Sequence, residues 1–84
     1  MIFYRCNIWC YKEGNENLGE KEEDMWLPLV FDLESVYAIK SNGEGNDFTG
    51  PNKAVIYLGN DHLVTDLDFD ELTSKWITNK AKKV

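Results

Sequence analysis

The sequence predicts an α+β domain: an antiparallel sheet of about five strands with one C-terminal amphipathic helix packed on a face. Three observations lead to this class. Apolar residues alternate along several short segments, a turn signal joins the last two segments, and one helical stripe follows them. The 84 residues suffice for one core, so we expect residues 1–84 to fold as a single domain.

Residues 2–11 are expected to form the first strand. Their side chains alternate between two faces, and both faces carry large apolar groups. Such a strand is typical of the middle of a sheet, or of a strand covered on both sides. Cys6 and Cys10 share one face at a separation of about 13 Å, which is beyond disulfide reach. We therefore expect two reduced cysteines, as in a reducing compartment.

Two polar segments are expected to be exposed loops. Residues 13–24 (EGNENLGEKEED) carry six acidic side chains against one lysine, and residues 41–52 (SNGEGNDFTGPN) are rich in Gly, Asn and Asp. The first loop is long enough to be either a solvated connection or a functional segment. Phe48 is the one aromatic residue of the second loop, and it either folds back onto the domain or anchors a partner.

Residues 26–31 and 36–40 are expected to form two further strands. A single turn at 32–35 re-aims the chain between them. Pro28 lacks the backbone N–H that a sheet ladder needs, which indicates an edge strand or a bulge.

The next two strands are expected to form a hairpin. Residues 54–58 and 62–65 are short apolar runs, and the dipeptide Gly59-Asn60 between them is a turn signal. A two-residue turn places His62 opposite Tyr57, as an ordinary cross-strand pair.

The C-terminal helix has the clearest local signals in the chain. Asp68 can accept from the first backbone donors, Glu71 can reach back, and Leu67 and Leu72 occupy the positions of a hydrophobic staple. The apolar stripe predicts four core residues: Phe69, Leu72, Trp76 and Ile77. Residues 81–84 are expected to be a frayed, Lys-rich tail.

No pattern of a catalytic or metal site fits this sequence. Three alternate aspartates imitate the opening of an EF-hand loop: Asp66, Asp68 and Asp70. However, Glu71 occupies the glycine position of that loop, and Ile77 occupies the twelfth position, where a bidentate glutamate belongs. His62 is the only histidine, and no marked nucleophile accompanies it. We therefore expect no catalytic residue, no metal site, no cofactor and no enzyme activity.

Charge disfavours nucleic acid as a direct partner. Residues 1–74 carry fifteen acidic and five basic side chains, and such a body repels phosphate backbones. The sequence has no apolar run near 18 residues and no signal-peptide pattern at its start, so we expect no membrane contact and a cytoplasmic location.

These observations favour a small acidic, non-catalytic protein-binding module with an accessory or regulatory role. The alternative is an inhibitor, of phage or mobile-element type, that occupies a nucleic-acid-binding or host-defence protein through nucleic-acid-like negative charge. A homo-oligomer also fits, because a small sheet leaves edges to pair. The candidate partner-binding residues are Glu20, Glu22, Glu23, Asp24, Phe48, Asp61, Asp66 and Asp70.

The stretch FDLESVYAIK…KAVIYLGNDHLVTDLDFDELTSKW resembles small flagellar-operon proteins of the FlbD type. The resemblance covers residues 31–76 and consists mainly of an apolar pattern. It implies a strand, a hairpin with a Gly-containing turn and a short acid-capped helix, in that order, and it transfers no functional residue.

Overall fold

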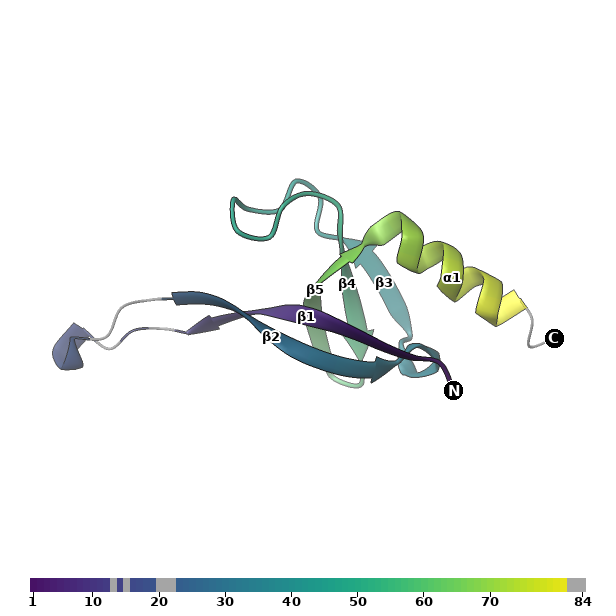
Figure 1. Cartoon of the computed structure of the whole chain (residues 1–84), viewed down its shortest axis with the longest axis horizontal. Helices are drawn as coiled ribbons and strands as arrows, with labels where there is room; N and C mark the ends of the chain where they lie inside the picture. Colours follow the sequence, from purple (N-terminus) through teal and green to yellow (C-terminus); the bar gives the residue numbers. More distant parts are fainter. Residues whose placement is uncertain (13, 15, 20–22, 82–84) are drawn as a thin grey trace.

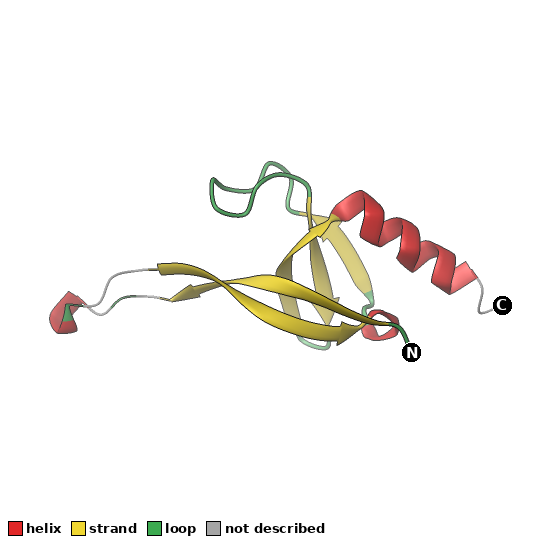
Figure 2. Ribbon diagram, in the orientation of Figure 1, coloured by secondary structure: helices red, strands yellow, loops and turns green. Residues whose placement is uncertain are grey.

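The computed structural model describes residues 1–12, 14, 16–19 and 23–81 (Figure 1). In this part of the chain, five antiparallel strands form a sheet in the order β2-β1-β5-β4-β3, and α1 packs on β3, β4 and β5. The elements are β1 (Phe3–Lys12), the 3-10 helix η1 (Glu16–Leu18), β2 (Glu23–Asp32), the 3-10 helix η2 (Leu33–Ser35), β3 (Ala38–Ser41), β4 (Lys53–Leu58), β5 (Asp61–Asp68) and α1 (Phe69–Ala81). The predicted α+β class is confirmed (Figure 2).

β1 and β2 form a long two-stranded ribbon. Their register runs without a break from Phe3 opposite Asp32 to Lys12 opposite Glu23. β1 also pairs with β5, so it lies inside the sheet, as its two apolar faces predict. β2 lies at the edge, which agrees with the missing N–H of Pro28. The far part of the ribbon extends away from the other strands (Figure 1).

Some element boundaries differ from the predicted ones. β2 begins at Glu23 rather than at residue 26, so Glu23 and Asp24 belong to the ribbon and not to the predicted loop 13–24. The reason is that the ladder with β1 continues past the apolar residues. Residues 13, 15 and 20–22 of that predicted loop lie outside the described residues. The same holds for 82–84 of the predicted tail, whose first residue, Ala81, ends α1.

The hairpin of β4 and β5 follows the sequence prediction. Leu58 pairs with Asp61 across the two-residue turn, and Gly59 there has a φ of +55°, which favours glycine. Tyr57 pairs with His62, and their rings stack with centroids 5.8 Å apart. The single histidine is thus part of a cross-strand pair.

The core lies between the base of the ribbon, η2, β4 and α1. Its buried apolar residues are Cys6, Phe31, Leu33, Val36, Ala54, Ile56 and Leu72. The predicted turn at 32–35 is η2, and its cap is Asp32, whose Oδ1 accepts from the N–H of Glu34 at 3.0 Å. The turn aims Leu33 into the core, where it is fully buried.

The helix begins as predicted. Asp68 Oδ2 accepts from the N–H of Glu71 at 3.0 Å, and Leu72 is buried. The prediction that Ile77 belongs to the core is wrong, because this side chain is 62% exposed. Ile77 lies about 100° around the helix from Trp76, beyond the narrow stripe that faces the strands.

No helix of the described residues is long and apolar enough to cross a membrane.

Leu72 and Ile77 make a matched pair for testing how the helix packs. We expect Leu72→Ala to lower the free energy of unfolding by about 2–4 kcal/mol, because it leaves a cavity in the core. Ile77→Ala should change that free energy by less than about 0.5 kcal/mol, because it removes an exposed side chain. Urea denaturation of both variants measures the difference, and equal losses would contradict the packing described above.

The Cys6 thiol gives a second test, through pH. Burial raises the pKa of this thiol from 9.0 to about 11, and the negative charge of Asp66 adds to the rise. In the unfolded chain the thiol ionises at its ordinary pKa, so its contribution to stability is complete below pH 9 and is lost between pH 9 and about 11.

We therefore expect the wild-type protein to lose more stability than Cys6→Ala between about pH 8 and about pH 10.5. Urea denaturation at both pH values measures this. An equal decline in wild type and Cys6→Ala would contradict a protonated, buried thiol.

Candidate functional site

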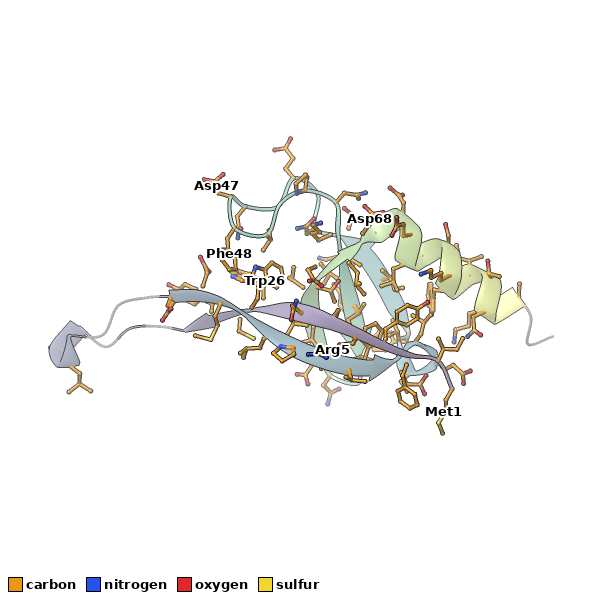
Figure 3. The ribbon with its side chains drawn as sticks, in the orientation of Figure 1. Met1, Arg5, Trp26, Asp47, Phe48 and Asp68 are labelled. Carbon is orange, nitrogen blue, oxygen red and sulfur yellow. The ribbon has the colours of Figure 1, made fainter. Side chains whose placement is uncertain are left out.

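Three aromatic side chains from three separate segments lie on one side of the ribbon. Trp9 of β1 lies directly opposite Trp26 of β2, so both indoles project from the same face. Phe48, from the loop after β3, stacks on Trp26 with ring centroids 5.4 Å apart and planes inclined by 21° (Figure 3). We call these three residues the aromatic cluster. Phe48 therefore folds back onto the domain, yet 41% of it stays exposed.

A cleft opens beside this cluster. It has a volume of about 260 Å³ and lies between the ribbon, β5 and the loop. Its lining residues are Trp9, Asn42, Gly45, Asn46, Thr49 and Val64. Trp9 and Val64 form an apolar floor, and the loop supplies uncharged polar walls. By contrast, the hollow between Tyr4 and α1 encloses only about 40 Å³, which is room for water alone.

The loop that walls the cleft is an ordered structure held by its own side chains. Asn46 Oδ1 accepts from the N–H groups of Phe48, at 2.9 Å, and Thr49, at 2.7 Å. Thr49 is buried, and its hydroxyl oxygen accepts from the N–H of Asn46 at 3.1 Å. These reciprocal bonds form a turn that aims Phe48 at the ribbon.

The base of the loop is tied to β4 and to the start of the helix. Asn42 Oδ1 accepts from the N–H of Lys53 at 2.7 Å, and its amide group donates to the carbonyl of Gly50 at 3.0 Å. Asn52 donates to Asp70 Oδ2 at 2.8 Å, and its carbonyl accepts from the N–H of Phe69 at 3.0 Å. The loop is therefore held in position by the domain itself.

The predicted partner-binding residues do not lie together in the structure. Asp24 contacts the aromatic cluster, because its Oδ1 accepts a hydrogen bond from Trp9 Nε1 at 2.8 Å. Glu23 precedes it in β2. Asp61 lies at the β4–β5 turn, about 17 Å along β5 from Asp66, so these two acids do not form one cluster. Glu20 and Glu22 lie outside the described residues.

The three aspartates that imitate an EF-hand are engaged separately. Asp66 accepts from the backbone and side-chain N–H groups of Asn7, Asp68 caps the helix, and Asp70 holds Asn52. Among the described residues, no three His, Cys, Asp or Glu side chains are grouped so that they could hold a metal ion.

Trp9 and Trp26 are the site residues that the sequence prediction missed. Neither residue stands out locally, and they become neighbours only through the register of the ribbon. The sequence signal that could have found them is the pairing of two long alternating segments on either side of residues 13–22.

No protein-family model, no curated protein and no solved structure matches this chain. The resemblance to FlbD-type proteins stays a prediction, and the site is interpreted from its own geometry.

Two glycines of the loop test its rigidity. Gly43 and Gly45 have φ of +67° and +66°, so alanine is strained at both positions, by about 1–2 kcal/mol. A Cβ at Gly45 would also clash with the carbonyl oxygen of Gly50 and meet Asn42 Nδ2 at 2.8 Å, whereas a Cβ at Gly43 would meet open space.

We therefore expect Gly45→Ala to cost more stability than Gly43→Ala and to displace Phe48 from Trp26. Urea denaturation measures the first effect, and the near-ultraviolet circular dichroism of the tryptophans measures the second. The same loss of signal in both variants would contradict the close packing at Gly45.

Proposed function

We propose that this protein is a small acidic, non-catalytic module that binds a protein partner at the aromatic cluster and its cleft. The observation that carries the proposal is the stacked pair of Trp26 and Phe48, which a hydrogen-bonded loop holds on the surface. Aromatic anchors of this kind supply much of the binding energy at protein interfaces. An accessory or regulatory role follows, since such a module acts by occupying its partner.

The loop is held in one conformation, and this supports a role in binding. Fixing a side chain at an interface costs about 0.5–1.5 kcal/mol each, and a surface that is ordered in advance avoids part of that cost. The aromatic surface also continues along β1 to Tyr11, which is 49% exposed and lies on the same face as Trp9. A cleft of about 260 Å³ beside such a row suits one inserted side chain of a larger partner better than a whole small molecule.

The alternative function, inhibition through nucleic-acid-like charge, stays a prediction with one supporting observation. Exposed acids lie next to the residues that line the cleft on two segments, namely Asp24 in β2 and Glu44 and Asp47 in the loop. Against it, Asp66 and Asp70 accept hydrogen bonds within the domain, and Asp61 lies at the β4–β5 turn, about 10 Å along β5 from Val64 of the cleft. A row of phosphate-like charges is therefore less well supported than an aromatic anchor.

Location and assembly complete the proposal. Cys6 and Cys10 are both free thiols, which suits a cytoplasmic protein. Homo-oligomers through the open edge of β2 are less favoured than a partner at the cluster, because Pro28 interrupts the donors of that edge.

Affinity capture from extracts of the source cells tests the proposed site. Immobilised wild-type protein should retain a partner, and Trp26→Ala and Phe48→Ala should each lower its retention about ten-fold or more, because they remove an anchor. Ile77→Ala is the control, since it removes an exposed apolar side chain far from the cluster. The fold of each variant is checked by its amide NMR spectrum. Equal retention by all four proteins would contradict the proposed site.

A further inference from the structure

We infer that the partner segment that enters this cleft is cationic, and that it presents an arginine side chain to Trp9. The inference rests on the proposed function and names the chemistry of the partner. It follows from three features of the described residues: an indole that lines the cleft, a carboxylate bonded to that indole, and the sign of the charges on both bordering segments.

The first feature is the position of Trp9. One face of Trp26 is occupied by Phe48, whereas Trp9 lines the cleft itself. A cation over the face of an indole is attracted by the ring quadrupole, and arginine makes this contact more often than lysine because its planar group can stack. The other walls carry no charge, so a guanidinium group meets no repulsion inside the cleft.

The second feature is Asp24. Its Oδ1 accepts from Trp9 Nε1 at 2.8 Å, which fixes a carboxylate at the edge of the indole. Two carboxylate oxygens have room for several donors, so this group can also accept from an arginine. The bond also polarises the indole N–H toward the acid, which favours a cation over the ring.

The third feature is the charge of the segments around the cleft. Residues 23–39 and 41–52 contain no lysine and no arginine, and the lysine next to the loop is Lys53, whose Cε would lie 3.8 Å from a Cβ at Gly50. Their exposed charged side chains next to the lining residues are Asp24, Glu44 and Asp47, and Figure 3 shows Asp47 at the tip of the loop that carries Phe48. The basic residue on the same face of β1 as Trp9 is Arg5, about 13 Å away along the strand. The border of the cleft is therefore complementary to a basic segment.

Titration with capped peptides tests this inference. The probes are hexa-arginine, hexa-citrulline, which keeps the shape without the charge, and hexa-glutamate. We expect hexa-arginine to shift the indole N–H signals of Trp9 and Trp26 in the NMR spectrum and to leave Trp76 unchanged. Hexa-citrulline should bind about ten-fold more weakly or worse, because it loses both the cation–π contact and the ion pair.

Two charge reversals distinguish attraction of the peptide to the acids at the cleft from attraction to the net charge of the protein. Asp47→Lys and Asp61→Lys make the same change in net charge, but Asp61 lies at the β4–β5 turn. We expect Asp47→Lys to weaken hexa-arginine binding about five-fold and Asp61→Lys to weaken it less than about two-fold. Equal effects of the two reversals, equal binding of citrulline and arginine, or unchanged Trp9 and Trp26 signals would each overturn the inference.

The inference and the proposed function can fail separately. If a captured partner depends on Trp26 and Phe48 but hexa-citrulline displaces it as well as hexa-arginine does, the binding site stands and the cationic partner is wrong. If capture is indifferent to Trp26 and Phe48, the proposed site itself fails, whatever the peptides do.

Discussion

The short contact between β1 and β5 is the constraint on which the rest of the structure depends. The two strands pair at Ile8 and Thr65, and Asn7 adds two hydrogen bonds to Asp66. Continuing this register would bring Trp9 opposite Val64, yet the ladder stops there and both residues line the cleft. Thr65, fully buried and bonded to the carbonyl of Ala54 at 2.7 Å, fixes β5 at the last paired position. The cleft exists because the ribbon leaves the sheet at this point.

The loop after β3 becomes a wall of that cleft because its base belongs to the rest of the fold. Asn52 holds the side chain of Asp70 and the N–H of Phe69, so the start of the helix and the end of the loop are one hydrogen-bonded unit. The start of the helix thus supports the position of Phe48 over Trp26 through the base of the loop. The loop loses its conformational entropy when the domain folds. Less conformational entropy would therefore be lost if a partner bound to it.

The parts of the fold that the sequence predicts are those with local causes. The Asp68 cap, the turn at 32–35 and the Gly59-Asn60 hairpin each depend on a few neighbouring residues, and the structure contains all three. The pairing of Trp9 with Trp26 depends on the register of two strands joined by a polar segment, and the composition of that segment does not fix the register. The prediction that Ile77 is buried is wrong for a similar reason: a helical stripe shows which residues are apolar, but the width of the surface that the helix covers decides which of them are buried.

Some acidic residues accept hydrogen bonds within the fold, and others lie exposed near the aromatic cluster. The net charge of −6 therefore combines two different roles. Several aspartates accept hydrogen bonds that hold the fold: Asp24, Asp32, Asp66, Asp68 and Asp70. An abundance of acids in the sequence therefore does not by itself indicate a charge-driven contact. At the proposed binding site, charge near the aromatic cluster would have a different effect, because electrostatic complementarity governs partner choice and association rate more than affinity. In this domain the aromatic contact would set how long a partner stays, and the surrounding acids would set which partners arrive.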